Sequence, residues 1–311
     1  MAVSIGTAAD YLDLLDRLRT FMLANGWASL RFDGGSEFIA EGEGLGGTDS
    51  IFIGIKADAN AGEDWFNWQL NGMTGFEAGQ AFAAQPGNIG YSASAYLPRI
   101  HLWNSAIPYW FVVNPRRVIV VAKISTIYQL CYLGWINPYL PATNMPYPLF
   151  IAGTSTASNG SRWSTVHDTH SFAVVQPVCA NGSSTEATIL TNPRSSARLW
   201  FGEWHGIQNY YNSSLSNATR WKHIWPYATN GGYQYLQMRT NPNDNGYVLT
   251  PVTVNFTSPS KYVFGEVDGI FHVSGFSNAV ENIVTIGADS YLVVQNVYRN
   301  TIGDYCAVKL A

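Results

Sequence analysis

The segment 167–170, HDTH, is the densest group of possible metal ligands in the sequence. In a strand its first histidine would face away from the aspartate and the second histidine, whereas in a loop the three could converge. A structural zinc site needs four ligands, and the sequence does not place His205 or His223 near this segment. We therefore expect no metal site, and interpret the segment as a polar loop held by its own hydrogen bonds.

Carboxylates beside aromatic rings raise the possibility of glycoside hydrolysis. Glu203 lies in LWFGEWHG, and Glu266 and Asp268 lie in FGEVDGIF. Glycosidases use two carboxylates in acid and base roles. Spacing along the chain does not establish such a pair, and Glu266 and Asp268 flank glycines, which is typical of turn or edge residues. A glycan hydrolase with Glu203 or Glu266 as the acid is one alternative function.

Sequence motifs of other catalytic classes are absent. The chain has no nucleophile elbow, zinc-protease motif, phosphate loop or dinucleotide-binding glycine motif. The glycine-rich segment Gly42 to Gly47 lacks phosphate-loop spacing, so we interpret it as a flexible connection. We expect no enzymatic activity, no catalytic residues and no cofactor.

An aromatic segment from Tyr210 to Tyr227 suggests a contact surface. Its candidate contact residues are Tyr210, Tyr211, Trp221, Trp225 and Tyr227. Tyrosine and tryptophan stack on sugar faces or on partner proteins at low entropic cost. A receptor- or glycan-binding surface is therefore a second alternative, and packing of these rings on the protein's own sheet is the simpler interpretation.

Composition restricts the partners. Only 12% of the 311 residues are charged and 14% are aromatic. This composition fits surface buried against other subunits and equally fits a large β-protein with an aromatic core. The net charge of −4 and the absence of a basic run argue against nucleic-acid binding. No apolar run is long enough to predict a membrane helix. Cys131, Cys179 and Cys306 are far apart, and we expect reduced, buried thiols.

The elements that would position these residues are mostly strands. An amphipathic helix is expected from Ala8 to Asn25 with Thr7 as its N-cap, because apolar residues recur at helical spacing. Afterwards the pattern becomes that of β-hairpins. The expected strands are Trp27–Phe32, Glu37–Glu41, Ile51–Ala57, Trp65–Gly72, Tyr109–Ile124 (two arms), Ser171–Gln176, Arg198–Trp204, Tyr233–Met238, Val252–Phe256, Ile283–Ile286 and Tyr291–Val297.

Several further segments are expected to be irregular or ambiguous. Ile127 to Ile136 fits a strand or a short helix, and Asn137 to Pro148 must be irregular because it is rich in proline. Long surface loops are expected at Gly153–Ser164 and Asn181–Ser196, which are rich in Ser, Thr, Asn and Gly. The predicted fold is mainly β (α+β), sandwich- or barrel-like, with antiparallel sheets. Its domains are 1–152 and 153–311, or a single continuous domain.

Four segments carry a family resemblance. They are the C-terminal block from Lys261 to Leu310, beginning KYVFGEVDGIFHVSGF, together with TAADYLDLLDRLRTFMLANGW, DWFNWQLNGMTGF and WFVVNPRRVIVVAKISTIYQLCYLGWINPYLPATNMPYPLFIAG. They are distributed along most of the length of the chain and resemble a family of structural virion proteins of tailed bacteriophages.

The resemblance implies an assembly role and no catalytic residues. It implies a multi-copy ring or collar in the neck or tail, assembled in the bacterial host cytoplasm and located in the virion. Its partners would be copies of itself and other neck, tail or capsid proteins. We expect no nucleic-acid and no membrane partner.

Overall fold

The described part of the chain is mainly β. The computed structural model describes residues 1–44, 49–88, 97–139, 141, 147–154, 162–165, 171–173, 186–190, 204–208, 223–225, 239–241, 246–256 and 262–311. For the residues between 186 and 241, and for 254–256 and 262–264, only the backbone is described. As predicted, antiparallel sheets dominate and an N-terminal α-helix, α1 (Tyr11–Leu23), precedes most of them.

The strands of the described residues form three larger sheets and one small one, with all pairs antiparallel. Sheet A has the order β1 (Ala2–Ala8), β7 (Ile107–Asn114), β8 (Arg117–Ile124), β9 (Ile127–Trp135), β11 (Leu149–Ala152), β12 (Glu186–Leu190), β13 (Trp204–Gln208). Sheet B has the order β2 (Ala28–Asp33), β3 (Glu37–Glu43), β4 (Ser50–Asn60), β5 (Trp65–Met73), β6 (Arg99–Leu102). Sheet C has the order β14 (His223–Trp225), β17 (Thr250–Phe256), β18 (Tyr262–His272), β21 (Tyr305–Lys309), β20 (Asp289–Gln295), β19 (Ile283–Ile286), and β10 (Asn137–Pro138) pairs with β18. The small sheet pairs β15 (Arg239–Asn241) with β16 (Gly246–Tyr247), and 3₁₀ turns cover Phe82–Ala84 and Trp163–Thr165.

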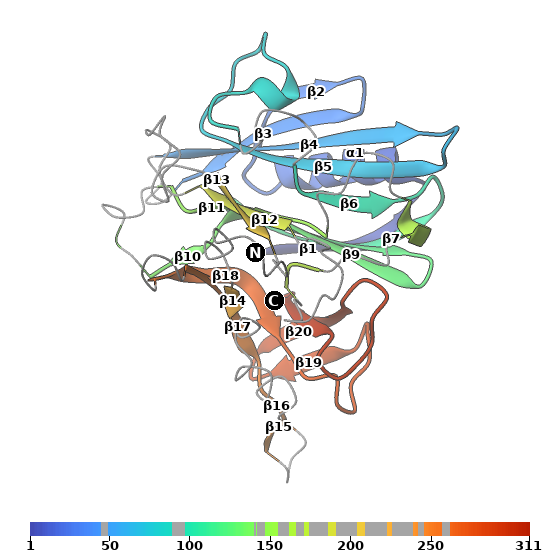
Figure 1. Ribbon diagram of the computed structural model, residues 1–311, viewed down its shortest axis with the longest axis vertical. Coiled ribbons are helices and arrows are strands. Elements are labelled where there is room, and N and C mark those ends of the chain that lie inside the picture. Colours follow the sequence, from blue (N-terminus) through green and yellow to red (C-terminus); the bar gives the residue numbers. More distant parts are fainter. Residues whose placement is uncertain are drawn as a thin grey trace, which may run out of the picture.

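Sheet A is the middle of three β-layers (Figure 1). One face packs with α1 against sheet B in the larger hydrophobic cluster, to which it contributes Phe111 and Leu133. The opposite face packs on sheet C in a second cluster, to which it contributes Val112 and Ile119. Alternate residues of one strand therefore enter different cores, because side chains alternate between the faces of a sheet.

Burial on both faces explains the composition of the central strands. The β8 sequence RVIVVAKI and the β9 sequence IYQLCYLGW are almost continuously apolar, and all of β9 is buried. An antiparallel strand with one solvent-facing side would alternate apolar and polar residues. The ambiguity between strand and helix in 127–136 is thus resolved as a strand buried on both sides.

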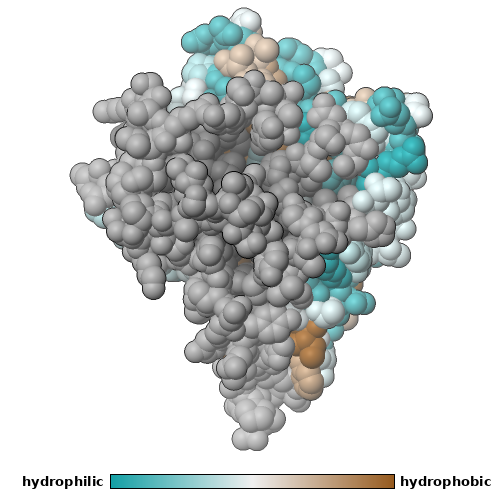
Figure 2. Space-filling model, in the orientation of Figure 1, coloured by the Kyte–Doolittle hydropathy of each residue, from teal (hydrophilic) through white to brown (hydrophobic). Residues whose placement is uncertain are grey.

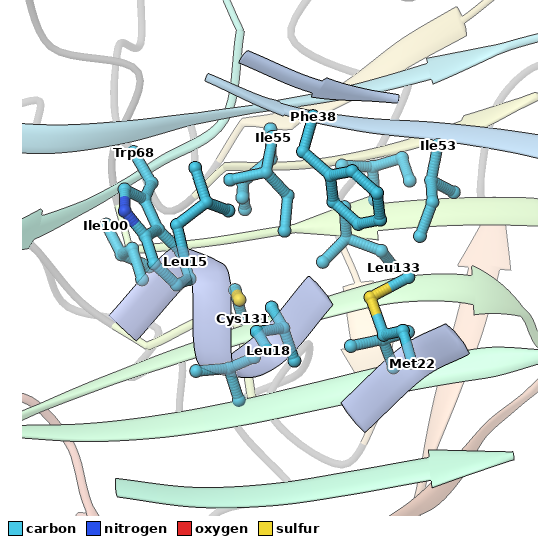
Figure 3. Packing of buried hydrophobic residues seen from close by; sticks show 14 of the residues in the cluster. Leu15, Leu18, Met22, Phe38, Ile53, Ile55, Trp68, Ile100, Cys131 and Leu133 are labelled. Atoms are coloured by element: carbon cyan, nitrogen blue, oxygen red, sulfur yellow. The ribbon is translucent and has the colours of Figure 1, made fainter. Parts of the chain in front are cut away.

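Helix α1 fills the space between sheets A and B. Leu15, Leu18 and Met22 point into the same core as Phe38 and other side chains of both sheets (Figure 3). The predicted apolar face is confirmed.

The predicted N-terminus of α1 is wrong. Thr7 lies in β1, and Asp10 is the N-cap, where its side chain accepts hydrogen bonds from the backbone of Leu12 and Asp13. The strand β1 escaped prediction because AVSIGTA is short and small-residue-rich, and it pairs with a strand about 100 residues later along the chain.

Most predicted hairpins are confirmed. The pairs β2–β3, β7–β8 and β19–β20 close at the expected turns, and Gly34 and Gly35 both have positive φ, as the first of these turns requires.

Other expectations are corrected. Residues Ser171–Ala173 form a turn and not a strand, and Glu186–Leu190, within the expected loop 181–196, is strand β12. Gly42 lies in β3, so the expected connection begins later than predicted. The two-residue strand β10 lies inside 137–148, the stretch that was expected to be irregular. The expected strand Tyr233–Met238 and most of Arg198–Trp204 lie outside the described residues.

Candidate functional site

Most residues considered as metal ligands, catalytic acids or glycan contacts lie outside the described residues. These are the segment 167–170, Glu203, Tyr210, Tyr211, Trp221 and Tyr227. Trp225 ends strand β14, which pairs with β17 in sheet C, and only its backbone is described. His205 lies in β13 of sheet A, whereas His223 lies in β14 of sheet C. Among the described residues, no three His, Cys, Asp or Glu side chains are grouped to hold a metal ion.

Glu266 and Asp268 do not lie in a turn, as the flanking glycines suggested, but within the long strand β18. Asp268 accepts a hydrogen bond from Nε of Arg117, whose side chain is only 3% exposed, so a charged pair joins sheets C and A. A Cβ at Gly269 would lie 2.6 Å from this guanidinium, which explains why glycine stands there. The hydroxyl of Tyr139 donates to Glu266. Both carboxylates are therefore engaged by protein donors.

A second charged tie crosses the same interface. Nζ of Lys123 in β8 lies 2.6 Å from Oε1 of Glu281, which follows β18 in the chain, and the hydroxyl of Tyr128 donates to the same oxygen. Burial alone would raise the pKa of Glu281, but the hydrogen bonds from Lys123 and Tyr128 outweigh it and hold the pKa below its usual range. Burial, followed by the bond to Glu281, raises the pKa of Tyr128 to about 12.

A third tie is buried and joins the amide of Asn296 to a backbone N–H and to a carboxylate. Oδ1 of Asn296 accepts from the backbone N–H of Ser171 at 2.8 Å, and Nδ2 of Asn296 donates to Asp304 at 3.0 Å. Asp304 also accepts from the hydroxyl of Thr301. Asn296 is fully buried and holds the backbone at Ser171 against the C-terminal part of the chain.

A buried polar network lies on the sheet B side, along β5. The polar face of β5 is formed by Asn67, Gln69 and Asn71, all buried. Gln69 donates to Asp58 at 2.5 Å, and Nη1 of the fully buried Arg99 lies 3.3 Å from the same carboxylate. A buried guanidinium requires such a partner, because removing a charge from water is costly.

The network continues into sheet A through an imidazole, an amide and a hydroxyl. Oδ1 of Asn67 lies 2.9 Å from Nδ1 of His101, which places the proton on Nδ1 because an amide oxygen only accepts. The backbone N–H of His101 donates to Oε1 of Gln129 in β9 at 3.2 Å, and the hydroxyl of Thr154 donates to the same oxygen. The N–H of Thr154 donates to the carbonyl of Arg99 at 2.8 Å. This arrangement ties the edge of sheet B to sheet A.

Shifted pKa values among the described carboxyl and thiol groups run opposite to those of a catalytic acid or a thiol nucleophile. A general acid for glycoside hydrolysis has a raised pKa, whereas the shifted carboxyl groups Asp13, Glu281 and Asp289 all have a lowered pKa. Burial raises the pKa of the Cys131 thiol and raises that of Cys306 to about 12, so neither is a ready nucleophile. Both thiols are free and buried, as predicted, and Cys179 lies outside the described residues.

The inter-sheet ties were missed by sequence reasoning. Apolar and polar residues alternate in FNWQLN, which is part of β5, and this pattern indicates a strand with one polar face. Because such a face ordinarily meets water, the pattern did not indicate a buried network. Nothing in the local sequence pairs Arg117 with Asp268, because the two residues lie 151 positions apart.

Comparison of the sequence with family models and with curated proteins finds no match. Within the described residues, no helix has the length and apolar character needed to cross a membrane.

Proposed function

We propose that the chain is a structural component of a tailed-bacteriophage virion that assembles in several copies, as a ring or collar of the neck or tail region. The ordered resemblance of four segments, from TAADYL to the C-terminal block, carries the proposal. Low charge and high aromatic content support it, because subunit interfaces are depleted of charge and rich in aromatic rings.

The use of polar groups in the described residues is consistent with a building block. The carboxylates that first suggested hydrolysis, Glu266 and Asp268, are bound by Tyr139 and Arg117. Three stacked β-layers joined by such ties give a scaffold that holds its shape while its outer surfaces make contacts.

Apolar side chains remain exposed at one end of the molecule. Four belong to sheet C or the loops that follow its strands: Phe276 (49% exposed), Ile283 (53%), Ile286 (42%) and Ile302 (41%). Hydrophobic atoms lie at the lower right of Figure 2, in the part of the molecule where Figure 1 places sheet C. Such side chains favour contact with neighbouring proteins in an assembly.

The proposal is tested on particles. Virions purified from the phage that encodes the chain should contain its peptides in a fixed stoichiometry relative to other neck or tail proteins, measured by quantitative mass spectrometry. An amber mutation early in the gene should give heads and tails that fail to join, or incomplete tails, in electron micrographs. Purified virions without its peptides, or normal infectious particles from the amber mutant, would refute the proposal.

A further inference from the structure

Strand β1 is one of the two outermost strands of sheet A, and among the described strands it pairs with β7 alone. Its register with β7 runs without interruption from Ala2↔Val113 to Ala8↔Ile107. Within the described part of the chain, no strand pairs with its other edge. The central sheet of the molecule therefore ends in a seven-residue edge.

The hydrogen-bond direction of this edge follows from the hairpins beside it. The β8–β9 hairpin closes with Ile124↔Ile127 around a two-residue turn, so this pair exchanges both backbone bonds. The next residue, Tyr128, accordingly sends its N–H away from β8, to the carbonyl of Val297 at 3.0 Å. Alternation then directs the N–H and C=O of Val121 toward Trp110 in β7.

The same alternation continues from β7 to β1. Because Trp110 bonds to β8, its neighbours Tyr109 and Phe111 bond to β1, where they face Gly6 and Ser4. The N–H and C=O groups of the odd residues 3, 5 and 7 consequently point outward. The outer edge of β1 presents three donor–acceptor pairs to whatever lies beside it.

The side chains of β1 do not protect this edge. Natural sheets protect edge strands with charges, proline, bulges or short length. One outer strand of sheet B, β2, has a register shift between Ser29 and Arg31 and ends in Asp33. One outer strand of sheet C, β19, has only four residues. In contrast, β1 has no charge, proline or bulge, and its central Ile5 is 62% exposed, the largest fraction among the exposed large hydrophobic side chains.

We propose that β1 pairs antiparallel with β1 of a second copy of this chain, so that sheet A continues across a two-fold axis at Ile5. The sequence AVSIGTA is complementary to itself in this register: Ala2 faces Ala8, Val3 faces Thr7, Ser4 faces Gly6, and Ile5 faces its equivalent. Small residues meet small residues, no like charges meet, and the two Ile5 side chains cover each other. The inference goes beyond the proposed virion role and does not rest on it.

Cysteine cross-linking tests the register. Hydrogen-bonded antiparallel partners have Cα atoms about 5.5 Å apart, within the range of a disulfide. Ile5→Cys, in a Cys179→Ser background, should therefore form a disulfide-linked dimer under mild oxidation, seen on non-reducing gels. The control is Thr7→Cys, which is also exposed, but whose two copies would lie roughly 13 Å apart along the paired strands. Equal cross-linking of both variants, or none of Ile5→Cys, would overturn the proposal.

Proline and lysine substitutions test the backbone pairing in solution. Ile5→Pro removes an outward N–H and leaves the bonds of Ser4 and Gly6 to β7 in place, whereas Ile5→Val keeps the N–H. One strand pair is smaller than a standard interface of about 1,600 Å², so we expect a concentration-dependent equilibrium in analytical ultracentrifugation. The wild type and Ile5→Val should dimerise, and Ile5→Pro should remain monomeric with an unchanged circular dichroism spectrum.

If Ile5→Pro fails to fold, Ile5→Lys provides the same test, because a lysine on an edge strand opposes pairing. A wild type that stays monomeric up to its solubility limit, or a dimer that Ile5→Lys leaves unaffected, would contradict the proposal.

Discussion

The interface between sheets A and B is filled by a helix, whereas sheets A and C pack directly and are joined by charged ties. Helix α1 places Leu14, Leu15 and Leu18 in the first interface. The buried amide of Gln129 that crosses this interface is uncharged, and the ion pair of Arg116 with Glu43 lies at its exposed rim. The second interface is crossed by two charged ties, one centred on Arg117 and one on Lys123.

The difference determines what each interface responds to. Apolar burial does not depend on the protonation of a side chain, whereas a carboxylate tie is lost when the carboxylate is protonated. We expect acid to loosen the A–C interface while the A–B interface, with α1, remains packed. Deletion of a buried apolar side chain should instead loosen the A–B interface more than the A–C interface.

The largest effect should come from a cavity in the A–B interface. Leu18→Ala deletes a side chain with 0% exposure, and we expect a loss of about 2–5 kcal/mol in the free energy of unfolding, measured by urea denaturation. Leu23→Ala is the control, because Leu23 lies on the same helix but is 36% exposed, and it should cost roughly 1 kcal/mol or less. Similar losses in both variants would show that α1 is not the filling element.

A smaller effect should follow from removal of the buried cation in the A–C interface. Arg117→Met keeps the apolar stem but leaves Asp268 without its charged partner. Because Asp268 is 33% exposed and can recover water, we expect a loss of about 2 kcal/mol, below the range for fully buried pairs. The neighbouring Arg116→Met removes a pair whose side chains are 46% and 42% exposed, and its effect should lie within about 1 kcal/mol of zero.

The pH dependence of the second tie separates the two interfaces further. The pKa of Glu281 is lowered in the folded state. The stability that this residue contributes to the folded protein is therefore present above the ordinary pKa of 4.5 and is lost as pH falls through the folded pKa. Glu281→Gln should cost no more than about 1 kcal/mol at neutral pH, because the side chains are partly exposed, and nothing in strong acid. A difference that persists unchanged in acid would contradict this origin.

At the alkaline end the same tie involves Tyr128. The pKa of Tyr128 is raised from 10.0 to about 12 in the folded state. The stability that its hydroxyl contributes is therefore fully present below pH 10.0 and is lost as the pH rises toward about 12. Tyr128→Phe should flatten the decline of stability across this window in thermal melts recorded at several pH values.

The smallest expected effect is the exposure of the native thiols in mild acid, which reports the opening of each core. Cys131 belongs to the A–B core and Cys306 to the A–C core. In a Cys179→Ser background, a dipyridyl disulfide should label neither thiol in the native state, and in mild acid it should label Cys306 before Cys131. Peptide mapping identifies the labelled thiol. Labelling in the reverse order would show that the A–C interface is not the one that acid opens.

Local elements could be predicted from the sequence because their causes are local. Gly34 and Gly35 supply the positive φ of the first hairpin, and Asn114 caps the turn of the central hairpin by accepting the N–H groups of Arg116 and Arg117. Predictions were wrong where a residue pairs with a segment that is distant along the chain. Thr7, a good helix cap by type, is taken into β1 by pairing with Pro108, and the cap falls to Asp10.

The candidate site was less predictable than the fold. Glycines beside Glu266 and Asp268 suggested a turn, but Gly269 with positive φ makes room for the guanidinium of Arg117 within a strand. The aromatic contact residues around Trp221 stay predictions, because all but the backbone of Trp225 lie outside the described residues.

The sequence by itself determined that this protein is mainly β, where its helix packs its apolar face, and where several hairpins turn. It predicted buried arms for the hairpin of β7 and β8, but it left 127–136 open between a strand and a short helix, and the structure shows a fully buried strand there. Only the tertiary structure decided which layers cover those faces, which carboxylates tie them together, and that β1 ends the central sheet unprotected. The physical reason is that turns and periodicity depend on neighbours in the chain, whereas layer order and ion pairing depend on which distant surfaces meet.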